Sequence, residues 1–176
     1  MELLTVLAVV GIMMSIVVPR MRVSAATEVQ LAGMQLAQDV DLSRTRALST
    51  RRFARVAFSP GTIASYTGYL DTDGDSTITG TDAERLALQA FGTRPMPDRV
   101  TIGRGSAPGI PGDASSSSVT FDNAQINFDT RGLPTPMGTS GIVYLQHTVD
   151  PTEVVAVALS PSGSVRLWTY HNGGWQ

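Results

Sequence analysis

The chain of 176 residues contains no cysteine and only two histidines, which narrows the chemistry open to it. Without cysteine it can form neither disulfide bonds nor metal sites with thiolate ligands. The histidines, His147 and His171, do not stand at the spacing of a helical metal-binding motif. The sequence also lacks the Gly-x-Ser-x-Gly motif of hydrolases and a phosphate-binding glycine loop. We therefore expect that the protein is not an enzyme.

Charge is also scarce in this sequence. Charged residues make up 16% of the chain, and the formal net charge is −2. This balance argues against a protein that binds nucleic acids or anionic membranes through general electrostatic attraction. Apolar residues make up 42% of the chain, which is ordinary for a folded domain. We expect one globular domain with its own core.

The longest uncharged stretch lies at the start of the sequence. Between Glu2 and Pro19 there are sixteen residues without a charge, which as a helix would cover about 24 Å. Three ordinary interpretations are a signal-peptide core ending near Ser24, a buried core helix and a plain membrane anchor. The unusual feature is Glu2, because a carboxylate at the depth of a bilayer costs about 2.5–3.5 kcal/mol and therefore suggests a function.

The residues from Glu2 to Ile12, ELLTVLAVVGI, resemble the N-terminal signature of type IV pilins and pseudopilins. In that family a glutamate stands near the start of the mature chain and a proline ends the first apolar stretch, as Pro19 does here. The basic leader, the glycine and the phenylalanine that accompany this signature do not stand before Glu2. We interpret this difference as a start codon placed too late or a trimmed chain.

Beyond Pro19 a helical pattern resumes. Apolar or small residues recur near the 3.6-residue period, while polar residues, including Asp39, fall on other faces. We expect one helix over residues 2–50 with a bend at Pro19, where proline can kink a helix. Residues 1–26 are expected to form a transmembrane and assembly segment, and residues 27–176 the globular domain. Residues 36–48 are similar to the end of this helix in the GspH/FimT-like branch of minor pseudopilins. The members of the expected buried stripe are Val29, Gly33, Leu36, Val40 and Ala47.

After the helix the period changes to two, which is typical of strands. The resemblance implies an α+β fold in which the helix packs on antiparallel β-sheets. Residues 128–132 and 154–166 resemble the C-terminal half of the same GspH/FimT-like branch. Residues 93–118 are rich in glycine, proline and serine and are expected to form a long exposed loop. The expected strands are 53–58, 63–70, 85–91, 119–121, 125–129, 142–147, 154–159 and 165–170.

An aspartate-rich stretch of twelve residues, 71–82, carries the sharpest chemical signal. Its carboxylates stand at alternate positions, from which they can converge on one hard cation, and Ile78 stands where such loops anchor to a core. A calcium site and a plain Asp/Gly turn are both open alternatives. Two differences from the EF-hand pattern are Ser76 in place of glycine and an aspartate, shorter than glutamate, at the last position. The candidate ligands are Asp71, Asp73, Asp75, Thr77 and Asp82.

Arginines form a second cluster, from Arg44 to Arg55, where the helix is expected to end. We interpret them as side chains that face the negative end of the helix, in preference to a nucleic-acid patch. FimT-like members that bind DNA carry a C-terminal Gly-Arg-x-Arg, of which only Gly163 and Arg166 stand here, so we do not expect nucleic acid as a partner. Trp168, Tyr170 and Trp175 are expected to pack in the core or at a sheet edge.

The resemblance implies a structural function. We expect a minor pilin or pseudopilin that lies in the bacterial inner membrane with its domain in the periplasm and then joins a type IV pilus or a secretion pseudopilus. Its partners would be other subunits of this kind, and Glu2 would meet the N-terminal amine of a neighbour. The alternatives are DNA capture during uptake and a membrane-anchored calcium-binding domain.

Overall fold

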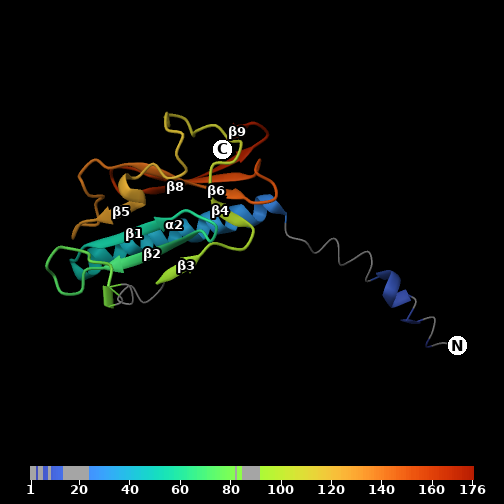
Figure 1. Ribbon diagram of the computed structural model, residues 1–176, viewed down its shortest axis with the longest axis horizontal. Coiled ribbons are helices and arrows are strands. Elements are labelled where there is room, and N and C mark those ends of the chain that lie inside the picture. Colours follow the sequence, from blue (N-terminus) through green and yellow to red (C-terminus); the bar gives the residue numbers. More distant parts are fainter. Residues whose placement is uncertain (1–2, 4–5, 8, 14–23, 82, 85–91) are drawn as a thin grey trace.

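A computed structural model describes residues 3, 6–7, 9–13, 24–81, 83–84 and 92–176. Glu2, Pro19, Asp82 and the expected strand 85–91 lie outside the described residues. Nine strands form two antiparallel sheets in the described part of the chain, and one long helix, α2, packs against both sheets (Figure 1). The expected α+β fold, with a helix on antiparallel sheets, is confirmed.

Helix α2 spans Ala25–Thr50 and has a well-defined start and end. The hydroxyl of Ser24 accepts a hydrogen bond from the Thr27 N–H at 3.3 Å, which caps one of the free N–H groups of the first turn. At the other end Arg51 adopts a left-handed conformation, with φ 54°, and the helix stops there. Leu3 and the described residues from Val6 to Met13 are also helical, but Ser24 is extended, with φ −70° and ψ 149°, so the prediction of a single helix over residues 2–50 is wrong.

The buried face of α2 is the one that the 3.6-residue period predicts. Val29, Gly33, Leu36, Val40 and Ala47 are all buried. At Gly33 the helix approaches the sheet so closely that an added Cβ would lie 2.6 Å from Cγ1 of Val155. The prediction for Asp39 is wrong, because this residue is also on the buried face.

The first sheet has the order β3-β2-β1-β5. Its central hairpin joins β1 and β2 with Ala54 opposite Leu70 and Ser59 opposite Ser65. Phe58 of β1 stacks on Phe121, which lies in the segment before β5, with ring centroids 6.4 Å apart. The strands are β1 (Ala54–Ser59), β2 (Ser65–Leu70), β3 (Thr93–Pro95) and β5 (Gln125–Phe128).

The second sheet has the order β4-β6-β7-β8-β9. Its inner face packs on α2, and its outer face carries Tyr144 among a second group of apolar side chains. Trp168, Tyr170 and Trp175 belong to that group, which agrees with the expectation that they pack rather than offer a stacking surface. The strands are β4 (Val100–Ile102), β6 (Gly141–His147), β7 (Val154–Leu159), β8 (Val165–His171) and β9 (Gly174–Trp175).

The prediction of a long exposed loop over residues 93–118 is wrong. This segment contributes β3 and β4, and it buries Met96, Ile102 and Ile110. The reason is tertiary: its few apolar side chains cover parts of the core that the sheets leave open, and strand partners far along the chain supply the hydrogen bonds. Residues 119–121 form only one bridge, from Val119 to Val143, in place of the expected strand.

Candidate functional site

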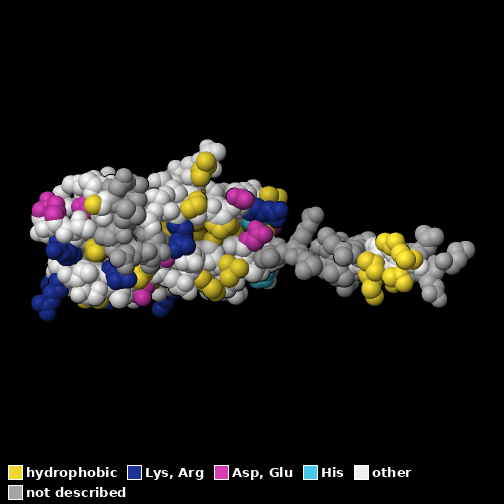
Figure 2. Space-filling view, turned by 90° about the horizontal axis from the view of Figure 1, so that it is seen from below, with side chains coloured by type: hydrophobic (Ala, Val, Ile, Leu, Met, Phe, Trp, Pro, Cys, Tyr) yellow, Lys and Arg dark blue, Asp and Glu magenta, His cyan; other side chains and the backbone are white. Residues whose placement is uncertain are grey.

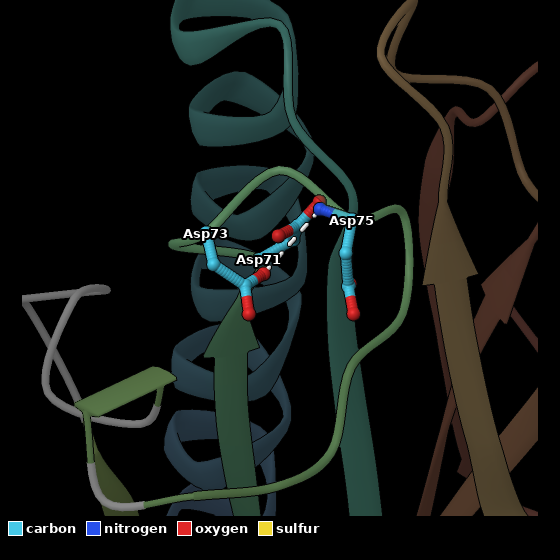
Figure 3. Close-up of side chains that lie close together, drawn as sticks. All are labelled: Asp71, Asp73 and Asp75. Carbon is cyan, nitrogen blue, oxygen red and sulfur yellow. Dashed lines mark hydrogen bonds between the residues drawn. The ribbon is translucent and has the colours of Figure 1, made fainter.

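The three aspartates of the predicted cation site lie together. Asp71, Asp73 and Asp75 each offer a carboxylate oxygen, and these oxygens lie within 4.8 Å of one another (Figure 3). They belong to the turn that follows β2, and Asp71 is 2% exposed while the other two face solvent. The predicted convergence is therefore present among the described candidates, whereas Asp82 lies outside them.

The backbone of this turn curls around its carboxylates. Asp71 accepts hydrogen bonds from the N–H groups of Gly74 at 2.7 Å and Ser76 at 3.2 Å. The carboxylate of Asp75 accepts one from the N–H of Thr77 at 2.7 Å. The N–H of Asp75, which donates to the Asp73 carboxylate, lowers the pKa of Asp73 below its usual value. These hydrogen bonds hold the three carboxylates close together.

Three features bear on whether this turn could bind calcium. Ser76 stands where the EF-hand loop has its glycine, and it adopts the left-handed conformation, with φ 67°, that normally calls for glycine. Ile78 is buried, as expected for the residue that anchors such a loop. A positive group already lies nearby, because Nη1 of Arg52 is 3.9 Å from Oδ1 of Asp71. The donor set fits a hard cation, and Arg52 reduces the negative charge that would attract it.

The arginines near the end of α2 do not act as predicted. The last turn of the helix carries no basic residue. Instead, Nε of Arg44 donates to the carbonyl of Gly132 at 3.0 Å, and Arg55 donates to Asn127 at 2.7 Å and to the carbonyl of Ile78 at 3.1 Å. These side chains tie loops to the helix and the first sheet. The arginine of the weak DNA motif, Arg166, lies over the ring of Trp168, with 5.6 Å between its Cζ and the ring centroid.

Sequence reasoning missed a buried carboxylate at the end of the aspartate-rich stretch. Glu84 accepts hydrogen bonds from the Thr79 hydroxyl at 2.9 Å and from the N–H groups of Gly80 and Thr81 at 2.7 and 3.2 Å. Burial alone would raise the pKa of Glu84, but these bonds outweigh it and hold the pKa below its usual value. The signal in the sequence was the pattern Thr81-x-x-Glu84, a capping box at a helix start.

A second missed group joins α2 to the first sheet. Asp39, only 4% exposed, accepts a hydrogen bond from the hydroxyl of Tyr66 at 2.6 Å and pairs with Nε of Arg94 at 2.8 Å. Burial and the bond to Asp39 raise the pKa of Tyr66. Because the carboxylate has both partners, its burial in the middle of the helix is tolerated. The sequence offered one signal, since Asp39 stands three residues after Leu36 on the apolar stripe.

The described residues of the N-terminal apolar run form a different kind of surface. From Leu3 to Met13, the large hydrophobic side chains that the structure describes are between 46% and 77% exposed. Within the described part of the chain, no helix has the length and hydropathy needed to cross a bilayer. Glu2 and Pro19, the predicted assembly residues, lie outside the described residues.

Comparison with known proteins identifies the fold. No protein-family model and no curated protein sequence matches the chain. Among solved structures it is similar to the type IV minor pilin FimU of Pseudomonas aeruginosa, with a TM-score of 0.54 and 13% identity over 80% of this chain and 88% of that one. This chain has the fold of a minor pilin. The minor pseudopilin EpsH from the type 2 secretion system of Vibrio cholerae gives a TM-score of 0.53 and 12% identity over 81% of this chain and 97% of EpsH.

Proposed function

We propose that the protein is a minor pilin or pseudopilin, a structural subunit of a type IV pilus or a type II secretion pseudopilus. The observation that carries this proposal is the combination of a minor-pilin fold with an apolar N-terminal run that starts at Glu2. The fold alone could serve other functions. An apolar run that leaves its described side chains exposed requires a partner outside the domain.

Two environments can cover such an apolar run, one before assembly and one after it. Before assembly the subunit lies in the bacterial inner membrane, where lipid covers the apolar side chains, and its domain lies in the periplasm. The helices of neighbouring subunits cover them after the subunit joins a filament. Only the second environment offers a carboxylate at position 2 a fixed positive partner, the N-terminal amine of a neighbour. The partners are therefore other pilin-type subunits, and the function is structural rather than catalytic.

The substitution Glu2→Ala tests this proposal. We expect the variant to insert into the inner membrane at least as well as the wild type, because a desolvation cost of about 2.5–3.5 kcal/mol is removed. Its incorporation into filaments should fall at least tenfold, because the charge that pairs with a neighbour is lost. Immunoblots of membrane and sheared-filament fractions measure both quantities. Thr5→Ala is the matched control, and equal incorporation of Glu2→Ala and wild type would contradict the assembly role of Glu2.

We also propose that the turn of residues 71–82 binds calcium weakly. The observation in favour is the convergence of the Asp71, Asp73 and Asp75 carboxylates within 4.8 Å. A carbonyl of Thr77 and the carboxylate of Asp82 would complete the set of oxygen ligands. The Arg52 guanidinium and the non-glycine residue at position 76 argue for an affinity of about 10⁻⁴–10⁻³ M, in the range of extracellular modules. The bound ion would fix the turn that follows β2.

A further inference from the structure

The edge of the second sheet differs from the other surfaces of the domain. On the face shown in Figure 2, hydrophobic side chains lie among basic and acidic ones, so the type of side chain does not single out a partner there. An uncovered strand edge is more specific, because its N–H and C=O groups are a template for a further strand. In the second sheet, the short strand β9 pairs with only one end of β8 (Figure 1).

The backbone hydrogen bonds of β8 alternate between its two sides. On the side of β7, the N–H of Ser160 donates to the carbonyl of Ser164 at 2.9 Å. Bonded pairs recur at every second residue of an antiparallel ladder, so the even-numbered residues of β8 bond to β7. The N–H and C=O groups of Val165 and Leu167 therefore point to the opposite side.

That opposite side of β8 is covered from Thr169 onward. Thr169 exchanges two hydrogen bonds with Gln176, each of 3.0 Å, and β9 continues the pairing from there. This agrees with the alternation, because Thr169 is an odd-numbered residue. Within the described part of the chain, no residue pairs with Val165 or Leu167 on this side. We call the N–H and C=O groups of these two residues the open edge of β8.

The open edge is held in place before any partner binds. On one side β8 pairs with β7 along its whole length, and the register has no bulge. Below it, Leu167 packs against α2, since a Cβ added at Gly33 would lie 3.0 Å from Cδ1 of Leu167. Proline, lysine and bulges commonly protect exposed edges, and residues 165–168 contain none of them. The edge is therefore preformed and unprotected.

The side chains on the two faces of β8 indicate which kind of strand fits. On the inner face, Val165 and Leu167 are half-buried and border the core, as does Ala37 of α2. On the outer face Arg166 is exposed, and its Cζ lies 5.6 Å from the centroid of the Trp168 ring. An added strand would place apolar side chains beside Val165 and Leu167 and, between them, a side chain opposite Arg166. A carboxylate suits that guanidinium best.

We propose that the open edge of β8 binds an extended segment of another protein, in which an acidic residue stands between two apolar residues. The segment runs antiparallel to β8, in line with β9, and pairs with the backbone groups of Val165 and Leu167. Its carboxylate binds Arg166, which the Trp168 ring holds in place. This inference goes beyond the proposed assembly function, because the site belongs to the domain and not to the apolar N-terminal run.

The β8 strand of a second copy does not fit this edge. The register that pairs both open residues of each copy sets Val165 of one opposite Leu167 of the other. Gly163 of the second copy would then lie opposite Thr169, where Gln176 already forms two hydrogen bonds. The occupant is therefore a separate segment that lies beyond Gln176.

Binding of a short peptide to the full chain in mild detergent tests this inference. The probe is acetyl-TVEVT-amide, followed by NMR of the backbone amides. We expect the amide signals of Val165 and Leu167 to shift, and their hydrogen exchange to slow by about fivefold or more at saturation. The amides of Arg166 and Trp168, which already bond to β7, are the internal control and should keep their exchange rates. Unchanged signals of Val165 and Leu167 would overturn the inference.

Modified peptides separate strand addition from attraction between side chains. N-methylation of both valines removes the N–H groups that face the edge and should weaken binding by about tenfold or more. N-methylation of the glutamate, whose N–H points away from β8, should have little effect. Equal losses from the two modifications would show that the peptide does not add as a strand, and the inference would be overturned.

Reversal of the charges tests the role of Arg166. Arg166→Glu should bind acetyl-TVEVT-amide about tenfold less tightly and should prefer acetyl-TVKVT-amide, whereas wild type prefers the acidic peptide. Arg99→Glu, at an arginine whose side chain is 60% exposed and outside β8, is the control and should keep the wild-type preference. Circular dichroism confirms that both variants are folded. An unchanged preference in Arg166→Glu, or signals of Trp168 that respond to a single-stranded oligonucleotide and not to the peptide, would overturn the inference.

Discussion

Glu84 is a buried carboxylate that the protein keeps charged with hydrogen bonds from Thr79, Gly80 and Thr81. Its pKa is lower in the folded state than in the unfolded chain. The stabilisation from this group is therefore fully present above the unfolded value, about 4.3, and is lost as the pH falls through the folded pKa. This acid-sensitive contribution to the free energy of unfolding comes from the turn at the end of the aspartate-rich stretch.

We expect Glu84→Gln to lower the free energy of unfolding by about 1–2 kcal/mol at pH 7, because an uncharged amide accepts these bonds less strongly. The difference from wild type should shrink between pH 7 and an acidic pH below the folded pKa of Glu84, where the carboxyl is protonated. Urea unfolding of the full chain in mild detergent at the two pH values measures this. Asp41→Asn, at an exposed position on α2, is the control and should change little at either pH. A difference independent of pH would contradict the role of the charge.

The proposed calcium site depends on the carboxylates of Asp71, Asp73 and Asp75 and on the backbone φ of residue 76. Saturation of the site at a hundredfold excess over Kd would stabilise the folded state by about 2.7 kcal/mol, or roughly 5–10 °C in Tm. We expect that shift in calcium and not in magnesium or chelator, and its loss in Asp73→Ala. In Ser76→Gly the calcium affinity should rise severalfold, because glycine adopts the positive φ of this position without strain.

Thermal melts of the full chain in each ion measure these effects, with Asp41→Ala as the control for loss of a carboxylate outside the turn. Equal Tm values in all conditions would mean that the turn is held only by its own hydrogen bonds. The spacing of the aspartates predicted their convergence correctly. The sequence could not show that Arg52 lies beside them, because Arg52 precedes β1 and the turn follows β2, so the antiparallel pairing of these strands brings them together.

Helix α2 depends on close contact with the second sheet at Gly33. An added Cβ would lie 2.6 Å from Cγ1 of Val155 and 3.0 Å from Cδ1 of Leu167. We expect Gly33→Ala to destabilise the protein by about 1–2 kcal/mol, because the cost of overpacking exceeds the gain in helix propensity of about 0.5–1 kcal/mol. Urea unfolding measures this, with Gly61→Ala, where an added Cβ meets nothing within 4 Å, as the control. A stabilised Gly33→Ala variant would show that the helix can shift away from the sheet.

The sequence predicted some elements well because their pattern is local. The stripe from Val29 to Ala47 follows the helical period, and the hairpin of β6 and β7 alternates or runs apolar between clear turns. Asp39 was misplaced because its burial depends on Arg94 and Tyr66, which come from other elements. Strands β3 and β4 were missed because each is only three residues long and β3 contains a proline, so only their partners reveal them.

The whole molecule has two parts with different environments. The domain buries its own core between α2 and two sheets, whereas the described N-terminal side chains remain exposed. Under the proposed function, lipid or other subunits cover them. The resemblance in the first residues predicted the fold, and the structural comparison with FimU and EpsH confirmed it. The open edge of β8 had no signal in the sequence, because it depends on which strands pair with β8 on either side.

The most direct test of the central claim, that this chain is a filament subunit, is to locate it in cells with an active pilus or secretion system. Filaments are sheared from the cells, purified and probed with an antibody against the domain, and an inner-membrane protein without a pilin fold serves as the contamination control. We predict that the chain is found in the filament fraction and disappears from it when the assembly machinery is deleted, while the membrane pool remains. A chain found only in the membrane fraction, with filaments present, would contradict the account.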